Sequence, residues 1–303
     1  MKLFIILIIN NYMILKKEST VRISMYVLLC LFILTLFVCI VLYVNKRLYM
    51  LKDNLLFSNC SLHTKNNIYK NNLIPKRIIQ TWKTHNIGKL EQLSQTWKHF
   101  NPSYTYTLFD DVECTNMIRE HFDTRVLEAY KNIKPGAFRA DLWRYCELYI
   151  NGGVYSDIDT VCIGSIDDVI LSDATFITPI DIRDKELFNA FIAVIKKHPI
   201  MLMCIEEVVS NVENNKEQKG FYFSGPGLLA DCVRSFLSMK KNESFVFDCS
   251  LNKGIQLLKM NKYNEIVYNS SGIELFQNKN KNNMIRTIYK KESFHSGIIK
   301  YSI

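Results

Sequence analysis

The sequence lacks the residue spacing of a structural zinc site. It contains nine cysteines and six histidines, but no CxxC pair and no Cys/His cluster at zinc-ligand spacing. A structural zinc ion is therefore not expected. Cys30 and Cys39 fall inside an apolar run and seven cysteines lie beyond it, which leaves the pairing of any disulfide open.

The chain also lacks the pattern of a nucleic-acid-binding protein. Its formal net charge of +9 alone would fit nucleic acid, an anionic membrane surface or a phosphate-bearing substrate. The excess lysine lies among asparagines, as at 65–67 and 279–283, without aromatic residues interleaved at base-stacking spacing. Solvated lysine faces explain such runs, so nucleic acid is not expected as a partner.

The composition excludes a disordered chain and indicates one large domain with appended segments. Hydrophobic residues make up 48% of the 303 residues and charged residues 22%, which is enough apolar material for a sizeable core. The predicted organisation is a cytoplasmic N-terminal segment at 1–24, a transmembrane anchor at 25–44, a polar stem at 45–72 and a catalytic domain at 73–303.

The predicted anchor is the stretch from Met25 to Val44, which contains no charged residue over twenty positions. As a helix it would span about 30 Å of hydrocarbon. Basic residues flank both ends, and the slight bias favours a cytoplasmic N-terminus. We therefore expect a single-pass type II protein that contacts the bilayer through 25–44, in the Golgi or ER membrane, with a lumenal domain. A cleaved signal peptide is the alternative, although its apolar core is normally only about 7–15 residues long.

The domain reads as alternating strands and helices. Residues 74–82, 104–109 and 154–163 have the pattern of strands, and 90–100, 117–130, 137–150, 199–212 and 227–239 that of helices. Such alternation predicts an α/β fold with a mainly parallel central sheet.

Asp157 and Asp159 stand one residue apart, inside or just after the short strand predicted at 154–163, and therefore near a strand end. The ends of strands in α/β sheets commonly carry ligand sites. Both carboxylates can therefore meet one hard cation and the phosphates bound to it. Departure of a diphosphate needs that neutralisation, whereas a solvated turn is the alternative explanation of an isolated Asp-x-Asp pair.

The surrounding block is more specific. From Lys134 to Thr160 it reads KPGAFRADLWRYCELYINGGVYSDIDT, which closely resembles the sugar-binding Asp-x-Asp region of glycosyltransferase family 32. That family includes initiating α-1,6-mannosyltransferases, inositol-phosphoceramide mannosyltransferases and capsule-type enzymes. The resemblance covers about residues 73 to 230, and it extends to the segments 74–84, 101–104, 109–111, 189–191, 198–199 and 224–227.

The resemblance implies a GT-A nucleotide-sugar domain, a retaining reaction and Mn²⁺ or Mg²⁺ as cofactor. The donor would be a GDP- or UDP-sugar such as a mannose donor, and the acceptor a glycan, glycoprotein or glycolipid. By the same resemblance Asp159 would be the principal metal ligand, and Asp157 would contact the donor or the metal. These two aspartates are the candidate catalytic residues.

The resemblance assigns further residues to the donor and the metal. Asp141 and Arg144, one helical turn apart, would grip the donor sugar and its phosphates, and Trp82 would lie against the nucleobase. His295 stands where many members carry a histidine near the metal. The alternatives are that Asp141 and Arg144 simply pair with each other and that Trp82 belongs to the core. Ile79 replaces a histidine that members often carry, so any role of that histidine is lost here.

Two other classes of function remain open on the sequence. The segment Asp157 to Val161 also fits the opening motif of haloacid-dehalogenase-type phosphatases, in which the first aspartate is a nucleophile. That motif normally follows a longer buried strand than the one available after Gly152 and Gly153. A non-catalytic glycan- or lipid-binding membrane protein is the other alternative, although both carboxylates of the motif are present.

Overall fold

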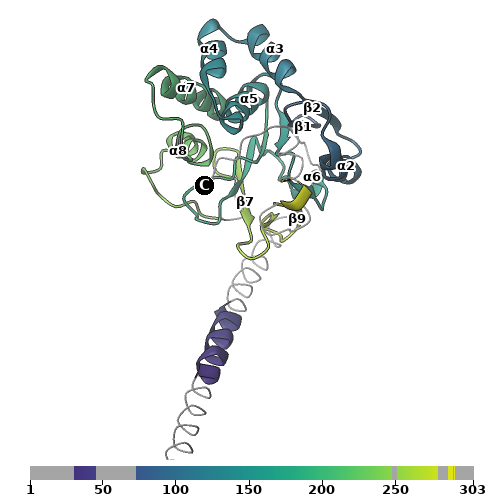
Figure 1. Ribbon diagram of the computed structural model, residues 1–303, viewed down its shortest axis with the longest axis vertical. Helices are drawn as coiled ribbons and strands as arrows, with labels where there is room; N and C mark the ends of the chain where they lie inside the picture. Colours follow the sequence, from purple (N-terminus) through teal and green to yellow (C-terminus); the bar gives the residue numbers. More distant parts are fainter. Residues whose placement is uncertain (1–30, 46–72, 248–250, 279–285, 289, 291–303) are drawn as a thin grey trace, which may run out of the picture. The chain divides into compact units, whose positions relative to one another are not determined.

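The computed structural model describes residues 31–45, 73–247, 251–278, 286–288 and 290; Figure 1 shows its ribbon. The chain divides into two compact units, Met1–Leu56 and Phe57–Ile303. In the first unit, residues 31–45 are helical with exposed side chains. No helix within these described ranges combines the length and apolar character needed to span a bilayer. Residues 25–30 of the predicted anchor and 46–72 of the predicted stem lie outside them, so the anchor stays a prediction.

The second unit is a mixed α/β domain. Its strands are β1 (Arg77–Thr81), β2 (Thr105–Phe109), β3 (Gly153–Ser156), β4 (Val161–Cys162), β5 (Phe176–Ile180), β6 (Phe191–Val194), β7 (Ile255–Met260), β8 (Ile266–Tyr268) and β9 (Glu274–Gln277). Its helices are η1 (Gly88–Leu90), α2 (Glu91–Phe100), α3 (Asp111–His121), α4 (Thr124–Asn132), α5 (Gly136–Asn151), α6 (Ile166–Val169), α7 (Pro199–Glu213) and α8 (Pro226–Leu237).

The described strands form one sheet in the order β2-β1-β3-β6-β5-β7-β8-β9-β4. The prediction of a mainly parallel sheet is wrong. Strand β1 runs parallel to β2 and β3, and β5 runs parallel to β7, but the other adjacent pairs of this order are antiparallel. The parallel pairs beside β1 arise because a helix lies between consecutive strands. Hairpin-like connections join β5 to β6 and β7 to β8 and β9, and such connections produce antiparallel pairs.

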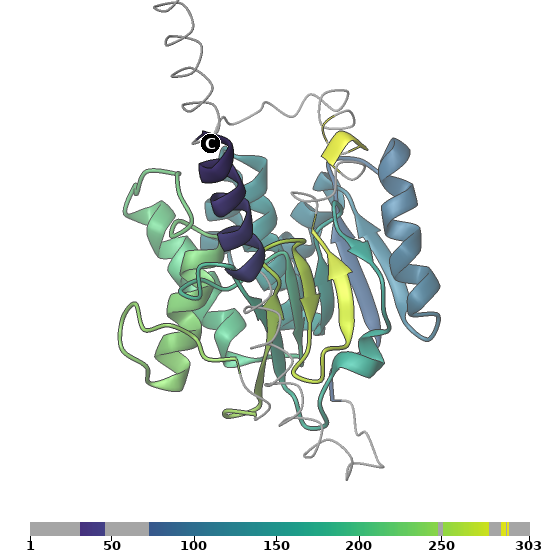
Figure 2. The same cartoon turned by 90° about the horizontal axis from the view of Figure 1, so that it is seen from below.

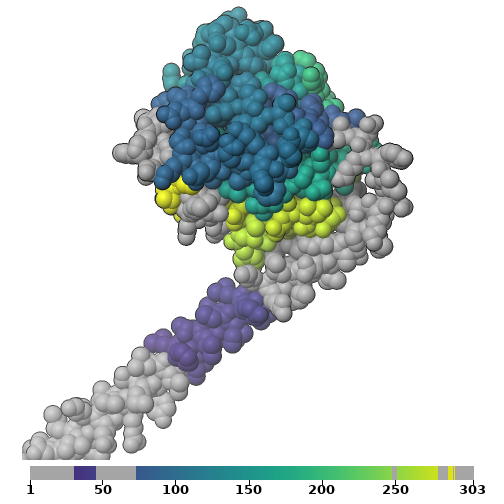
Figure 3. Space-filling view, turned by 90° about the vertical axis from the view of Figure 1, so that its right-hand side faces the viewer, coloured from purple at the N-terminus to yellow at the C-terminus, as the bar shows by residue number. Residues whose placement is uncertain are grey.

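Helices cover both faces of the sheet, as Figure 2 shows. One hydrophobic core joins a face of the sheet to α3, α4, α5, α7 and α8, and a second core joins the other face to α2 and α6. Ile79 of β1 packs into the first core and Ile78 into the second. Successive side chains of a strand point to opposite faces, so β1 is buried on both sides. The surface shown in Figure 3 is formed largely by the part of the chain coloured blue, which includes α2 and α3.

The chain passes from α5 to β3 through two glycines with positive φ. A Cβ atom on Gly152 (φ +62°) would lie 2.8 Å from the main-chain nitrogen of Lys196. On Gly153 (φ +103°) it would lie 2.4 Å from Cγ and 2.9 Å from the carbonyl oxygen of Arg77. Only glycine combines these dihedral angles with that space. The Gly-Gly pair thus allows the close passage from the end of α5 into the start of β3.

The helix predicted over 117–130 is two helices instead of one. Helix α3 ends at His121, and α4 begins at Thr124 after the N-cap residue Asp123, whose carboxylate accepts from the main-chain nitrogen of Val126. Aspartate is a favoured N-cap residue. The apolar positions keep a helical spacing across Asp123, and for that reason the sequence pattern predicts one continuous helix.

Candidate active site

The Asp-x-Asp segment forms the turn between β3 and β4. Thr160 donates to the carbonyl oxygen of Asp157 from its main-chain nitrogen at 3.2 Å and from Oγ1 at 2.7 Å. The main-chain nitrogen of Asp157 donates to the carbonyl of Ala190 at 2.9 Å, which ties the turn to β6. The single strand predicted at 154–163 is therefore two strands, β3 and β4, and the two aspartates lie in the turn between them, on backbone that is fixed at both ends.

Gln80 holds this turn from the neighbouring strand β1. Its side chain is fully buried, and its Nε2 donates to the carbonyl oxygen of Asp157 at 3.0 Å. The hydroxyl of Tyr106, on β2, donates to Oε1 of the same side chain at 2.7 Å. A buried amide with both ends satisfied fixes its partners firmly, so Gln80 positions the motif from 77 residues away.

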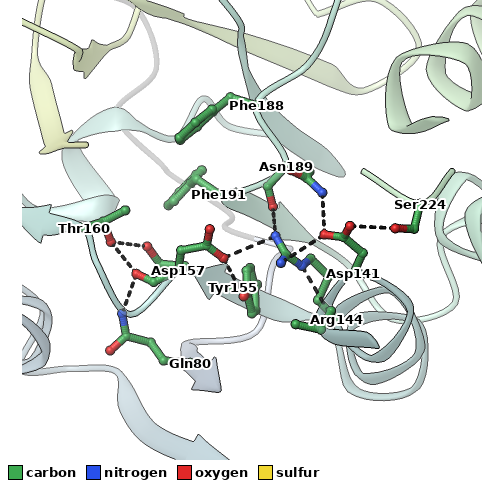
Figure 4. Close-up of polar contacts among 12 residues, drawn as sticks. Gln80, Asp141, Arg144, Tyr155, Asp157, Thr160, Phe188, Asn189, Phe191 and Ser224 are labelled. Atoms are coloured by element: carbon green, nitrogen blue, oxygen red, sulfur yellow. Dashed lines mark hydrogen bonds and ion pairs between the residues drawn. The ribbon is translucent and has the colours of Figure 1, made fainter. Parts of the chain in front are cut away.

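The side chain of Asp157 is bound by two residues of the site, as the close-up in Figure 4 shows. Its Oδ1 accepts from the hydroxyl of Tyr155 at 2.6 Å and lies 3.3 Å from Nη1 of Arg144. The guanidinium of Arg144 also stacks 4.2 Å from the centre of the Tyr155 ring. Burial raises the pKa of Tyr155 well above its usual value, so the hydroxyl keeps its proton and remains a donor to the carboxylate.

Arg144 links Asp157 to the second predicted pair. Its Nη2 lies 3.1 Å from Oδ1 of Asp141, and its Nη1 donates to the carbonyl of Asn189 at 2.6 Å. Asp141 and Arg144 do pair across a turn of α5, and the same guanidinium extends beyond that pair to the Asp-x-Asp motif. An ion pair that served the helix alone would not include the contact of Arg144 with Asp157.

Two residues from loops that are distant in the sequence also donate hydrogen bonds to the carboxylate of Asp141. Asn189 Nδ2 donates to Oδ1 at 2.8 Å, and Ser224 Oγ donates to Oδ2 at 2.8 Å (Figure 4). Burial raises the pKa of Asp141 above its ordinary value, and the positive charge of Arg144 works against that rise. Both loops belong to the segments that carry the resemblance, 189–191 and 224–227, but nothing in the sequence predicts a contact of either residue with Asp141.

The remaining predicted site residues lie elsewhere or outside the described ranges. Trp82 is 8% exposed and belongs to a small apolar cluster that includes Leu93 and Ile158. That placement agrees with the core alternative, and its contact with a nucleobase stays a prediction. His295 lies outside the described residues, and so does any test of its role at a metal.

The residues of the turn fit a hard divalent cation. Asp157 and Asp159 offer carboxylate oxygens, the ligand type that Mn²⁺ and Mg²⁺ prefer. The side chain of Asp157 is 32% exposed, whereas Asp159 is buried at 4%. The guanidinium of Arg144 is shared between Asp141 at 3.1 Å and Asp157 at 3.3 Å, so a cation bound by the turn would face carboxylates whose charge Arg144 only partly neutralises.

A separate group of possible metal ligands has a structural explanation. His85, Asp110 and Glu113 bring ligand atoms within 4.8 Å of one another. Asp110 accepts from two main-chain nitrogens at the start of α3, and Glu113 accepts from the nitrogen of Asp110, which together form a capping box. Their geometry therefore follows from the helix end, and His85 is an exposed addition to it.

The segment that contains most of the site matches one family of known proteins. Residues 89–177 match the family described as "Glycosyltransferase sugar-binding region containing DXD motif". This segment contains four of the predicted site residues, Asp141, Arg144, Asp157 and Asp159. The resemblance inferred from the sequence is confirmed, and the phosphatase interpretation of Asp157 is not supported.

Individual relatives agree over part of their length. The chain is 35% identical over 106 residues to the initiation-specific alpha-1,6-mannosyltransferase of Candida albicans, a match that covers 32% of this chain and 27% of the relative. It is 29% identical over 161 residues to inositol phosphoceramide mannosyltransferase 2 of Schizosaccharomyces pombe, which covers 51% and 43%. The chain thus spans less than half of the length of either relative.

Among solved structures, the PaToxG glycosyltransferase aligns with a TM-score of 0.46 and 18% identity, over 62% of this chain and 80% of that one.

Proposed function

Because residues 89–177 match the sugar-binding region of DXD-motif glycosyltransferases, we propose that the chain transfers a hexose from a nucleotide-sugar donor to a glycan, glycoprotein or glycolipid acceptor. The proposed hexose is mannose or a similar sugar, the proposed donor a GDP- or UDP-sugar. The proposed domain type is GT-A, with retention of anomeric configuration. The mannosyltransferases among the relatives support this choice.

One observation carries the proposal from the chain's own geometry. Arg144 lies 3.1 Å from Asp141 and 3.3 Å from Asp157, so a single guanidinium connects the sugar-side carboxylate to the Asp-x-Asp turn. A nucleotide sugar needs both recognition of its hydroxyls and neutralisation of its diphosphate. The arrangement offers carboxylate acceptors for hydroxyls beside a positive charge suited to phosphate oxygens.

The residues divide these tasks by their chemistry. Asp159 and Asp157 would hold Mn²⁺ or Mg²⁺, which when bound supplies Lewis-acid stabilisation of the charge that grows on the departing diphosphate. Arg144 would add a fixed positive charge on the same side. Asp141 is held by Asn189 and Ser224 and would accept hydrogen bonds from sugar hydroxyls. No side chain of the site is assigned as a nucleophile.

The proposed setting is a membrane of the secretory pathway. The uncharged stretch 25–44 would anchor a type II protein in the Golgi or ER membrane, with the domain in the lumen. There it would meet lumenal nucleotide sugars and glycoconjugate acceptors.

A nucleotide-sugar hydrolysis screen with the purified full chain tests the proposal. In the presence of Mn²⁺, we expect slow release of free hexose from one GDP- or UDP-sugar and none from the others. Hydrolysis of no donor, together with absence of nucleotide binding by calorimetry, would exclude a transferase acting on these donors.

A further inference from the structure

Two loops converge on Asp141 and continue to the protein surface. The connection from β5 to β6 contains Asn189 near its end, and the connection from α7 to α8 ends in Ser224 and Gly225. Asn189 and Ser224 each donate to the carboxylate of Asp141 at 2.8 Å. A Cβ atom on Gly225 would lie 3.4 Å from Oδ2 of Asp141, so the second loop passes directly against the site.

The outer parts of the same loops meet and expose large apolar side chains. The guanidinium of Arg183, in the first loop, lies 4.6 Å from the centre of the Phe221 ring in the second. Ile182 is 47% exposed, Phe221 44% and Tyr222 50%. We call Ile182, Phe221 and Tyr222 the aromatic rim. Exposed apolar patches bordered by polar residues mark binding sites, and binding residues lie disproportionately on loops.

The backbone beneath the rim is fixed, although the rings add little to the core. The carbonyl oxygen of Phe221 accepts from the main-chain nitrogens of Gly227 and Leu228 at 3.0 and 3.3 Å, which caps the first turn of α8. A Cβ atom on Gly227 would lie 2.8 Å from the Tyr222 ring, so that ring packs flat on the glycine. One face of an aromatic ring is thereby held against the protein while half of its surface remains open. Such a preformed platform binds a ligand at a low entropic cost.

The charge around the rim favours a neutral ligand. The first loop carries three acidic residues, Asp181, Asp184 and Glu186, against two basic ones, Arg183 and Lys185. Arg183 is already paired with Asp181 at 3.3 Å and with Glu186 at 2.5 Å. In the second loop, Lys216 lies 3.9 Å from Glu207 and Lys219 lies 2.5 Å from Glu217. Neither loop therefore leaves a surplus of positive charge for a phosphate or an anionic lipid surface. Aromatic faces next to exposed polar side chains suit a sugar ring, which has an apolar face of C–H groups and a periphery of hydroxyls.

We propose that the aromatic rim binds a neutral saccharide unit of the acceptor beside the donor site. The proposal rests on the proposed function and deepens it, because it assigns acceptor recognition to residues beyond the matched segment 89–177. The donor would be held by Asp141 and Arg144, and the acceptor sugar by the loops that also position Asp141.

The test compares the double variant Phe221→Ala/Tyr222→Ala with wild type, in the full chain. Phe100→Ala is the matched control, since Phe100 is an aromatic residue with 38% exposure on α2, outside both loops. Binding is followed by saturation-transfer NMR with methyl α-D-mannopyranoside, methyl α-D-glucopyranoside and methyl α-D-galactopyranoside as probes. Donor hydrolysis without acceptor is measured in parallel, and thermal melting verifies that each variant is folded.

We expect saturation transfer to at least one glycoside in wild type and in Phe100→Ala, and its loss in the double variant. We further expect the acceptor KM of the double variant to rise by about tenfold, the size of a lost aromatic stacking contact, with donor hydrolysis unchanged. Retained glycoside binding in the folded double variant would overturn the proposal, as would absence of binding to every probe in wild type. Loss of binding to neutral phosphatidylcholine vesicles without any change toward glycosides would make the rim a lipid contact instead. Absence of both donor hydrolysis and nucleotide binding in wild type would refute the proposed function alone, because the NMR measurement depends on neither.

Discussion

Nε2 of Gln80 donates a hydrogen bond of 3.0 Å to the main-chain carbonyl of Asp157, so a fully buried side chain on β1 fixes the turn that carries the Asp-x-Asp motif. The neighbouring strands β1 and β3 run parallel, and their ends therefore lie at the same edge of the sheet. The position of the two carboxylates is therefore fixed by the neighbouring strand β1 as well as by the turn itself.

Replacement of Gln80 by leucine removes that contact without changing the volume greatly. We expect a loss of about 1–3 kcal/mol in the free energy of unfolding, because the Tyr106 hydroxyl and the Asp157 carbonyl lose a buried partner. We also expect Mn²⁺ affinity, measured by electron paramagnetic resonance of the free ion, to fall by about tenfold or more, as for other residues that orient metal ligands. Tyr106→Phe leaves the bond to Asp157 in place and should retain most of the affinity. A folded Gln80→Leu protein with wild-type Mn²⁺ affinity would show that the turn needs no such support.

The passage from α5 to β3 should tolerate no side chain. Gly153→Ala places a Cβ atom 2.4 Å from the Arg77 side chain at φ +103°, and we expect it to cost about 2–4 kcal/mol of unfolding free energy. Gly136→Ala is the control, since a Cβ atom there meets nothing within 4 Å and alanine favours the helix. Urea unfolding of both variants measures the difference, and equal stabilities would contradict the close approach of β3 to Arg77.

His198 should make the domain less stable in mild acid. The residue is 3% exposed, and burial lowers its pKa to about 4, from 6.5 for an unperturbed histidine. As the pH falls, His198 therefore takes up a proton in the unfolded chain before it does so in the folded one. Its contribution to the free energy of unfolding is complete above pH 6.5 and is lost as the pH falls toward 4. The loss amounts to about 3 kcal/mol.

The matched variant for this prediction is His198→Asn. His198 caps α7 by accepting from the main-chain nitrogen of Ile200, and asparagine is a good N-cap that does not titrate in this range. Urea unfolding at pH 7, 5.5 and 4 should give a smaller acid loss in the variant than in wild type. The same pH dependence in both proteins would assign the acid sensitivity to other groups.

The sequence predicts the local parts of this fold better than their pairing. The helices α5 and α7 follow from apolar positions at helical spacing, and β1 and β2 from short runs rich in β-branched and aromatic residues. Strands β5 and β6 are buried on both faces, so their short apolar runs show no alternation, and no strand is predicted at either position from the sequence. The mixed sheet depends on such strands, and for that reason the prediction of a mainly parallel sheet was wrong.

The site shows the same limit. Asp141, Arg144, Asp157 and Asp159 stand close together in the sequence, and the motif that joins them predicts them as a group. Asn189 and Ser224 reach Asp141 across 48 and 83 residues, and no spacing rule links residues so far apart. Hydrogen-bond partners of this kind become visible only when the strands and loops that carry them are folded together.

The measurement that tests the central claim most directly is the Mn²⁺ dependence of donor hydrolysis in wild type and in Asp159→Asn. The substitution keeps the volume of the side chain and removes its charge, and we expect it to abolish hydrolysis and transfer while thermal melting of the metal-free protein stays within a few degrees of wild type. Wild-type activity should stop in EDTA and return with added Mn²⁺, because the diphosphate leaves only when its charge is neutralised. A folded Asp159→Asn protein that works at the wild-type rate, or a wild-type protein that is unimpaired in EDTA, would contradict the assignment of the Asp-x-Asp turn as a metal site.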